Sequence, residues 1–434
     1  MTPERPEHER PKHDQPDAAE QSKAPEHLKT PEHLKTDVVI VGGGMAGLTL
    51  AAALGGVGLG VVVVDTQAQG DKIATPYDGR TSAIAHGSMR VLKGIGLWPR
   101  LVGEAEPILD IRVSDGDSRL FLHYDHRGIG DDPLGYIVEN TVIQRALHAH
   151  LADLPSVRVL APARVAALDR SGNFARALLA DGRIVFAALA VAADGRSSPM
   201  RRAAGIAVTQ WRYGQTSLVC TVAHEIPHRG IAHERFLPAG PLAVLPMRGQ
   251  RSSIVWSERD DVAAAAFALD DRAFTTEIER RFGPWLGSMT LVGGRWRYPL
   301  GLAHAECYVA DRLVLLGDAA HAIHPIAGQG FNLGLRDIAV LAEVVVDAVR
   351  LGLDPGDAQA LARYERWRRF DSMALVVATD ALNRLFSTAF PPLRLARTLG
   401  LAAVDRLPPL KRLFMRHAMG VVGDLPRLAR GEAL

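Results

Sequence analysis

The sequence predicts an α/β fold: a Rossmann-like layer that appears in three pieces along the chain, an inserted antiparallel sheet, and a helical carboxyl-terminal region. Asp37–Val41 and Val61–Val64 are continuously apolar runs typical of buried parallel strands, and Leu48–Leu54 between them is predicted as a helix. Together they form a β-α-β unit. Further along, alternating apolar and polar residues, as in Leu218–Val222 and Ser253–Trp256, indicate antiparallel strands.

The predicted domain boundaries follow from where these patterns change. The Rossmann-like layer is expected over residues 37–109, 137–210 and 298–350, the inserted substrate-binding sheet over 110–136 and 211–297, and the helical region over 351–434. Within the last piece of the layer, residues 329–350 are predicted to form one long helix.

The first 36 residues differ from the rest. They are charged and proline-dotted, with Leu28 and Leu34 as large apolar side chains, and they repeat the sequence PEHLKT at Pro25–Thr30 and Pro31–Thr36. Such a segment buries too little apolar surface to offset the entropy of ordering it, so a disordered leader is predicted over residues 1–36. It also lacks the apolar central region of a secretory signal.

Composition excludes several classes of protein. Apolar residues make up 47% and charged residues 23% of the chain, an ordinary balance for a globular protein. The net charge of +2 is not the basic excess expected of a nucleic-acid-binding protein. Cys220 and Cys307 are too few for a disulfide framework or a zinc site, and no run approaches the roughly 18 apolar residues of a membrane span. We therefore expect a cytoplasmic protein without a metal.

The first glycine-rich turn predicts a dinucleotide site. Gly42–Gly47 matches GxGxxG and stands between a strand and a helix, where its glycines allow a tight turn, close approach of a pyrophosphate, and close helix–strand packing. The helix amino terminus offers free N–H groups to the phosphates. Asp65, at the end of the second strand, can accept hydrogen bonds from ribose hydroxyls. This unit alone does not decide between FAD and NAD.

Two later segments decide between FAD and NAD. Leu189–Ala192 is an apolar run followed by Asp194–Gly195, and Leu313–Leu316 is a second run followed by Gly317–Asp318. Because ligands bind at the carboxyl ends of strands in α/β sheets, both turns are expected at the dinucleotide site.

A second helix start follows the second of these turns. Pro325 ends the extended segment, and Gly328 and Gly330 open a helix whose N–H groups are suited to the negative charge of a reduced flavin. His321 and His324, in the same stretch, are interpreted as packing residues.

The three fingerprints GxGxxG, DG and GD, in this order, resemble those of group A flavoprotein aromatic hydroxylases, the class of para-hydroxybenzoate hydroxylase. Within that class the chain resembles the ubiquinone-biosynthesis hydroxylase family, over roughly residues 36–420. Asp65 stands where Glu is commoner, and Ala193 where Cys is commoner. Further family-like stretches are Asp78–Ala85, Tyr213–Gln215, Ala232–Phe236, Gly240–Ala243 and Asp380–Phe386.

The resemblance implies one non-covalent FAD. Asp65 would hold the adenosine ribose and Asp318 the ribityl or pyrophosphate region, while Asn332 and the glycines before it would face the isoalloxazine edge. Arg80 and Gln144 would add polar contacts, and the DG motif would serve both FAD and NAD(P)H. The implied cofactor-binding residues are Gly42, Gly44, Met45, Ala46, Gly47, Asp65, Arg80, Gln144, Asp194, Gly195, Gly317, Asp318, Pro325, Gly328, Gly330 and Asn332.

The resemblance also implies the chemistry. NAD(P)H would reduce FAD, O₂ would add to give a hydroperoxyflavin, and the aromatic ring of a polyprenylated phenol would take one oxygen atom in ubiquinone biosynthesis. NAD(P)H is expected to be a co-substrate without its own domain, because no second complete GxGxxG unit is seen. No residue is singled out as the catalytic base; His324 and Tyr298 lie near the right segments.

The carboxyl-terminal segment Leu407–Gly420 mixes apolar and basic residues. A basic amphipathic helix can lie on an anionic membrane surface, where a polyprenylated substrate resides. The alternative is a helix packed on the catalytic domain with a solvated basic face. The expected partners are a membrane-borne polyprenyl phenol, O₂, the inner face of the membrane as a peripheral contact, and a quinone-biosynthesis complex.

Two other functions remain open from the sequence. The same scaffold carries halogenation and isoprenoid reduction, although the Trp-x-Trp-x-Ile-Pro segment usual in flavin halogenases is not present. Alternatively, the chain is a non-catalytic FAD-binding subunit of a quinone-synthesis complex. Reduction of the bound flavin by NAD(P)H, followed by reoxidation in air, separates catalysis from this last role.

Overall fold

The computed structural model describes Thr2 and residues 33–434 except 75, 76, 78, 117, 119, 120 and 387–390. Most of the predicted leader and Asp78 therefore lie outside the described residues. The first strand, β1 (His33–Val41), begins four residues earlier than the predicted boundary. His33–Thr36, assigned to the leader from composition, instead pair in register with Ile184–Ala187 of the neighbouring strand.

The Rossmann-like layer is a mixed sheet with a parallel centre. Its strand order is β17 (Val309–Ala310), β18 (Leu313–Leu315), β11 (Ile184–Ala192), β1, β2 (Val61–Val64) and β8 (Val157–Leu160). The strands from β18 to β8 are parallel, whereas β17 is antiparallel to β18. The hairpin of β9 (Val165–Asp169) and β10 (Ala175–Leu179) extends β11 antiparallel. The centre of this sheet is fully buried, as its continuous apolar runs predict.

Helices pack on this sheet and on one another. The helix predicted after β1 is α1 (Met45–Gly55), which contacts α4 (Asn140–Ala152) and the long helix α8 (Gln329–Arg350). A small sheet of β3 (Thr81–Ala85), β7 (Gly135–Glu139) and β4 (Glu106–Ile108) lies beside them. Shorter helices are α2 (Gln69–Ala74), α3 (His86–Gly94), α5 (Pro199–Ala203), α12 (Arg427–Arg430), and the 3₁₀ turns η1 (Trp98–Arg100) and η2 (Val102–Glu104).

The inserted sheet has eight strands. Their order is β19 (His321–Ala322), β16 (Met289–Ala305), β12 (Val208–His224), β15 (Arg251–Arg259), β14 (Gly240–Met247), β13 (Ile231–Leu237), β5 (Asp110–Asp115) and β6 (Phe121–Asp125). All neighbours are antiparallel except β13 and β5. Each of β12 and β16 runs for 17 residues across a predicted domain boundary, so no loop separates the layer from the inserted sheet there.

One face of the inserted sheet is covered by α6 (Asp260–Phe267) and α7 (Asp271–Phe282). Leu218, Trp256 and Phe274 belong to the apolar core between them. The remaining 3₁₀ turns are η3 (His126–Gly128), η4 (Pro284–Leu286), η5 (Gly317–Ala319) and η6 (Ile326–Gly328).

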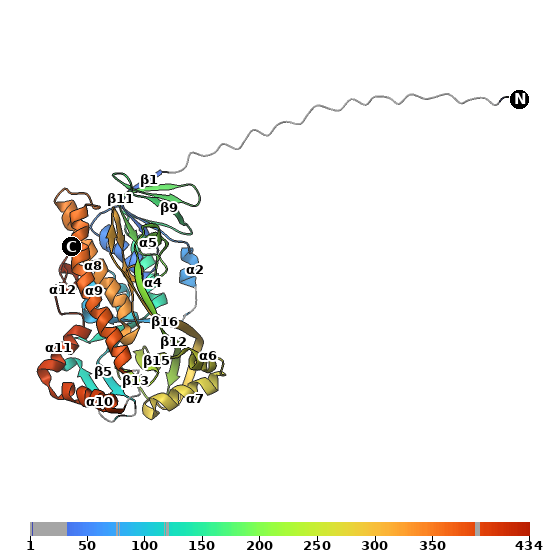
Figure 1. Cartoon of the computed structure of the whole chain (residues 1–434), viewed down its shortest axis with the longest axis vertical. Coiled ribbons are helices and arrows are strands. Elements are labelled where there is room, and N and C mark those ends of the chain that lie inside the picture. Colours follow the sequence, from blue (N-terminus) through green and yellow to red (C-terminus); the bar gives the residue numbers. More distant parts are fainter. Residues whose placement is uncertain are drawn as a thin grey trace.

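The carboxyl-terminal region is helical, as predicted. Helix α9 (Ala358–Phe386) runs beside α8 along the molecule, and α10 (Pro391–Arg406) and α11 (Pro408–Ala418) lie at the end that holds β5 and the inserted sheet (Figure 1). Across the described part of the chain, no helix has both the length and the apolar character needed to cross a membrane.

Candidate functional site

The predicted motifs meet at the carboxyl edge of the parallel sheet. The Gly42 N–H donates to the Val64 carbonyl (2.8 Å), and the Ala193 N–H donates to the Val41 carbonyl (2.8 Å). The turn after β1 is therefore tied to the ends of both β2 and β11. On the next strand, the Leu316 N–H donates to the Ala192 carbonyl (2.9 Å). The GxGxxG, DG and GD turns thus follow three adjacent strands.

The glycines of the first turn have two different environments. A Cβ at Gly42, whose φ is +111°, would lie 2.3 Å from the Ala193 oxygen, and one at Gly47 would lie 2.0 Å from the Gly42 oxygen. These two positions are crowded by the protein itself. A Cβ at Gly44 meets nothing within 4 Å. The fold therefore does not require glycine at Gly44, whereas a pyrophosphate approaching the backbone does.

Asp65 and Asp194 flank this turn. Asp65 is buried, and a Cβ at Gly43 would lie 2.4 Å from its Oδ2, so the carboxylate abuts the turn. One oxygen of Asp194 accepts a hydrogen bond from the Met200 N–H (3.0 Å). Its other oxygen is buried and has no hydrogen-bond partner among the described residues. A buried carboxylate oxygen without a partner is costly, so it fits an ordered ligand group in front of it. Beside it, a Cβ at Gly195 meets open space.

The GD turn lies between α1 and α8. A Cβ at Gly317 would lie 3.5 Å from the Ala46 Cβ, on the first turn of α1. The Asp318 side chain is exposed, yet the surrounding protein desolvates it enough to raise its pKa, against the opposing charges of His321 and Arg196. Asp318 is therefore open to solvent beside the turn and is not sealed in a core. Met45 and Ala46 are half-buried on the facing helix.

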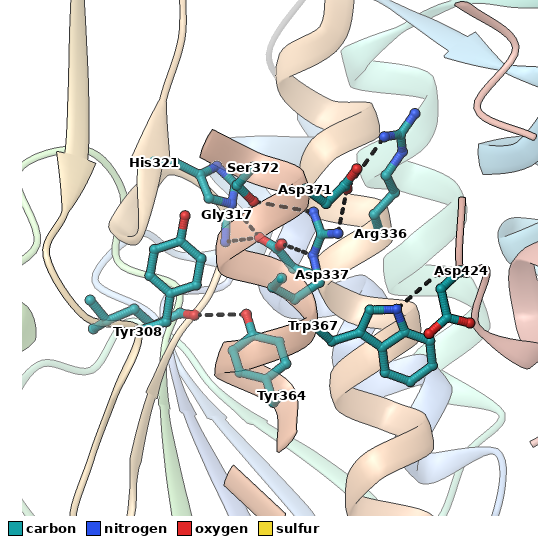
Figure 2. Close-up of polar contacts among 12 residues, drawn as sticks. Tyr308, Gly317, His321, Arg336, Asp337, Tyr364, Trp367, Asp371, Ser372 and Asp424 are labelled. Atoms are coloured by element: carbon teal, nitrogen blue, oxygen red, sulfur yellow. Dashed lines mark hydrogen bonds and ion pairs between the residues drawn. The ribbon is translucent and has the colours of Figure 1, made fainter. Parts of the chain in front are cut away.

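A buried charge network fixes the GD turn from behind. Asp337 of α8 accepts hydrogen bonds from the Gly317 N–H (3.1 Å), from His321 Nε2 (2.7 Å) and from Arg368 Nε (2.7 Å). Although burial raises the pKa of Asp337, His321 and Arg368 together hold it below its ordinary value. Figure 2 shows Gly317, His321 and Asp337 converging, with Asp371 at the edge of the group.

This network was not predicted from the sequence. His321 has the structural role expected of it, because it is 3% exposed and bonded to Asp337. Asp337 and Arg368 were not predicted, because they lie 20 and 51 residues beyond Gly317 on two different helices. The only available signal was an acid and an arginine on otherwise apolar faces of predicted helices.

The amino terminus of α8 is anchored to β3. Gly328 is in the left-handed conformation (φ +60°), and a Cβ there would lie 2.8 Å from the Ala83 Cβ. Asn332 donates from Nδ2 to the Ala83 and Gly328 carbonyls (2.7 and 3.0 Å) and accepts from the Ala85 N–H (2.9 Å). Its side chain therefore clamps the helix start to β3. Gly330 is exposed, and a Cβ there meets open space.

The remaining predicted cofactor-binding residues are Pro325, Arg80 and Gln144. Pro325 is half-buried directly before η6, and Arg80 is exposed directly before β3. Gln144, on α4, has a buried Oε1 without a hydrogen-bond partner among the described residues. Open space at Gly44, Gly195 and Gly330, together with the unpartnered oxygens, fits FAD along this edge. The individual contacts with FAD stay predictions.

His324 contrasts with His321. It is 0% exposed, both ring nitrogens have no hydrogen-bond partner among the described residues, and its ring meets that of Tyr213 edge-on at 5.2 Å. Burial lowers the pKa of His324 to about 4, against the opposing charge of Asp380. His324 is therefore a neutral packing residue at ordinary pH. Tyr298, the other candidate base, is 36% exposed on β16.

Comparisons with known proteins agree with this geometry. Residues 35–379 match the FAD binding domain family. Over 401 residues the chain is 53% identical to the ubiquinone hydroxylase UbiL of Rhodospirillum rubrum, covering 92% of this chain and 93% of that protein. It is 35% identical over 388 residues to the 3-demethoxyubiquinol 3-hydroxylase of Escherichia coli, covering 89% and 98%.

Solved structures have the same architecture. p-Nitrophenol 4-monooxygenase PnpA from Pseudomonas putida aligns with a TM-score of 0.75 at 20% identity, covering 89% of this chain and 98% of that one, a likeness that shows the fold. PqsL, a probable FAD-dependent monooxygenase from Pseudomonas aeruginosa, aligns with a TM-score of 0.71 at 25% identity, covering 84% and 100%. The predicted fold class and family resemblance are therefore confirmed. The chain belongs to the FAD-binding domain family and, within it, to the ubiquinone-biosynthesis hydroxylases, which are FAD-dependent aromatic monooxygenases.

Proposed function

We propose that the protein hydroxylates the aromatic ring of a polyprenylated phenol in ubiquinone biosynthesis, with NAD(P)H and O₂ as co-substrates. The observation that carries this proposal is the convergence of three glycine/aspartate turns on one sheet edge, in a chain 53% identical over 401 residues to a ubiquinone hydroxylase. When bound, FAD supplies the redox chemistry: electrons from NAD(P)H reach O₂ through it, one oxygen atom goes to the ring, and the other leaves as water.

The chain's own residues hold and orient the reacting groups. The first turn and Asp65 would hold the adenosine and pyrophosphate, since Gly44 leaves room for close approach. Asp318 would hold the ribityl or pyrophosphate region. The start of α8, clamped by Asn332, would place its N–H groups toward the pyrimidine edge, where they stabilise the negative charge that develops on reduction.

The carboxyl-terminal helices suit a lipid-borne substrate. Met415 of α11 and Met419, directly after the helix, are buried against the inserted sheet, whereas Leu413 and Phe414 of α11 are exposed (48% and 45%) among exposed basic residues. A small apolar hollow lies between this helix and the sheet, lined by Ile111, Tyr124, Leu134, Met415, Ala418 and Met419. We propose that α11 contacts the inner face of the membrane and that the polyprenyl chain enters near it.

The central experiment measures the reaction directly. Purified protein is expected to carry FAD, to oxidise NAD(P)H faster in the presence of a prenylated phenol, and to give a product one oxygen atom heavier. Deleting the gene in its host should accumulate a quinone precursor that lacks one ring oxygen. A flavin that is reduced and reoxidised without any phenol-dependent product would instead support another reaction on this scaffold. A flavin that NAD(P)H does not reduce would support the non-catalytic role.

The membrane contact has its own test. Sedimentation with vesicles of anionic phospholipid is expected to carry down the wild type, and high salt should weaken the binding because the attraction of basic side chains is screened. The double variant L413S/F414S should stay in the supernatant with normal FAD content. Equal sedimentation of the two proteins would mean that α11 only packs on the sheet.

A further inference from the structure

The two faces of the inserted sheet are distinguished by strand register. Leu242 pairs with Trp256, and both side chains lie in the core against α6 and α7. Because side chains alternate between the faces of a strand, Ala243 points to the opposite face. Glu234 of β13 pairs with Ala243 and therefore shares this face, which is the one not covered by α6 and α7. His233 and Arg235, its neighbours along the strand, point toward α7, as the contacts of both with Phe282 confirm.

The face that carries Glu234 is turned toward the predicted cofactor site. On this face Tyr77 bonds to Thr221 (2.5 Å), and Thr81, at the start of β3, donates to Ser253 (3.1 Å). Apolar residues beside Glu234 also link this face to the predicted cofactor site. Ala232 is in one cluster with Ala83, the residue against which Gly328 packs.

Other neighbours of Glu234 also connect it to residues 326–328. Phe236, the next residue on this face of β13, is in a second cluster with Ile326 of η6. Val113, beside Glu234 on β5, is packed against both clusters. Glu234 therefore lies between two groups of residues that contact 326–328, the segment predicted to hold the flavin edge.

Glu234 is an acid without a partner in these surroundings. Its lateral neighbours are Ala243 and Val113, and among the described residues no hydrogen bond or ion pair reaches its carboxylate. Burial raises the pKa of Glu234 to about 7. The side chain nevertheless keeps some solvent contact.

Other charged groups near this face are already paired or lie elsewhere. Asp115, two residues after Val113 on β5 and on the same face, is bonded to Arg397 of α10 (3.1 and 3.2 Å). Arg112 of β5 points to the opposite face with His233. On α9, Asp380 lies beside Tyr213 and His324; one of its oxygens pairs with Arg384, and the other has no hydrogen-bond partner among the described residues. Two hydroxyls on the Glu234 face, Ser217 and Ser257, are buried without hydrogen-bond partners. An apolar surface with a few unpartnered polar groups is typical of a small-molecule site.

We propose that Glu234 contacts the phenolic hydroxyl of the substrate and accepts its proton. The proposal rests on the proposed function and adds to it the residue that activates the ring. In this step the phenol O–H bond breaks, the proton passes to the Glu234 carboxylate, and the electron pair stays on the phenolate oxygen. The phenolate donates electron density into the ring, which attacks an electrophilic oxygen more readily. The neutral acid then returns its proton to solvent.

This assignment explains why the two candidates from the sequence are less suited. His324 is sealed from solvent and neutral, with a pKa of about 4, so it is a weak proton acceptor. Tyr298 carries the same phenolic group as the substrate, so it offers no better acceptor for the proton. A carboxyl group that titrates near pH 7 is matched to proton transfer under ordinary conditions.

The test compares Glu234→Gln, which keeps the size of the side chain, with Glu258→Gln as a control. Glu258 is a buried acid of the same sheet, but it faces α6 and α7. The ligands are a short-chain prenylated phenol and its O-methyl ether, which lacks the transferable proton. FAD content, NAD(P)H-dependent flavin reduction, product formed per NAD(P)H consumed, and the pH profile of kcat are measured on the holoenzymes.

We expect E234Q to retain FAD and its substrate-free reduction by NAD(P)H, while kcat for the phenol falls about 10²-fold or more, as for loss of a general base. The rise of wild-type kcat through pH 7 should be absent in E234Q, and the yield of product per NAD(P)H should fall. Binding of the phenol, read from the flavin spectrum, should weaken about tenfold, and binding of the ether should be unchanged. E258Q should match the wild type in all of these.

Wild-type kcat and pH profile in E234Q would overturn the proposal, as would equal weakening of phenol and ether binding. Failure of the proposed function looks different: wild-type protein would then form no hydroxylated product. In that case the phenol and ether binding comparison still decides whether Glu234 contacts a phenolic hydroxyl.

Discussion

The Asp337 carboxylate lies 3.1 Å from the backbone nitrogen of Gly317 and accepts its hydrogen bond. Asp337 is the ninth residue of α8, the helix whose first turn is clamped to β3 by Asn332. One rigid helix therefore positions both the GD turn and the helix start at the predicted flavin edge. At 1.5 Å per residue, Asn332 and Asp337 are separated by only about 7.5 Å along its axis.

Replacing Asp337 with Asn should unfold the site. The change removes the fully buried carboxylate that pairs with Arg368 and leaves the more exposed Asp371 beside that guanidinium, and breaking a buried ion pair typically costs about 3–5 kcal/mol. We expect urea denaturation to show a loss of this size and FAD to dissociate during purification. Asp261→Asn is the control, because its pair with Arg259 is exposed and worth less than about 1 kcal/mol. Similar stability of the two variants would contradict the role given to the network.

Alanine at two glycines of the first turn should separate folding from cofactor binding. G42A combines a disfavoured φ with a Cβ 2.3 Å from the Ala193 oxygen, so a loss of roughly 2–5 kcal/mol is expected. In G44A the Cβ meets no protein atom, so thermal unfolding of the apoprotein should be nearly unchanged. FAD affinity of G44A should nevertheless fall about tenfold, near 1.4 kcal/mol, measured by fluorescence titration. Normal FAD affinity in G44A would mean that the pyrophosphate does not lie there.

Asn332→Ala should loosen the start of α8. Three hydrogen bonds are lost and the Ala85 N–H is left unpaired, for an expected cost of about 3 kcal/mol in unfolding free energy. Asn140→Ala, which removes one bond to Ser82, should cost only about 1 kcal/mol. Hydrogen exchange at residues 326–334 should accelerate in N332A alone. Unchanged exchange there would show that the helix start is held by other contacts.

His324 should make the protein sensitive to acid. In the unfolded chain it takes a proton below about pH 6.5, whereas burial holds its folded pKa near 4. Between these values the unfolded state binds more protons, so stability falls as the pH is lowered, by up to about 3 kcal/mol from this residue. H324L should lose less stability between pH 7.5 and 4.5 than the wild type, while H417L, at an exposed position, should behave like the wild type. Identical pH dependence in all three proteins would contradict the burial of a neutral His324.

Local spacing explains what the sequence could predict. GxGxxG, Asp65 and the apolar strands around them are fixed within one β-α-β unit, so their arrangement follows from chain geometry. Glu234 lies in a family-like stretch, but its place on the substrate face could not be predicted, because it depends on pairing with β14 and β5. Asp337 and Arg368 meet only when α8 packs against α9. Contacts between elements that are distant in sequence leave no periodic pattern to read.

The boundaries between domains were also less predictable than the motifs. Composition marked the leader as ending at Thr36, yet His33–Thr36 gain strand partners from β11. Pairing partners that lie about 150 residues away decide whether a polar segment is ordered.

The two 17-residue strands β12 and β16 stay hydrogen-bonded to each other from one half of the molecule to the other, with two local register shifts. This continuous pair of strands, interrupted locally at 213–215 and 293–294, resists bending between the halves. We therefore expect entry and exit of reactants to rely on movement of loops and of the ligands themselves, and the distance between the cofactor layer and the substrate sheet to stay nearly constant through the catalytic cycle.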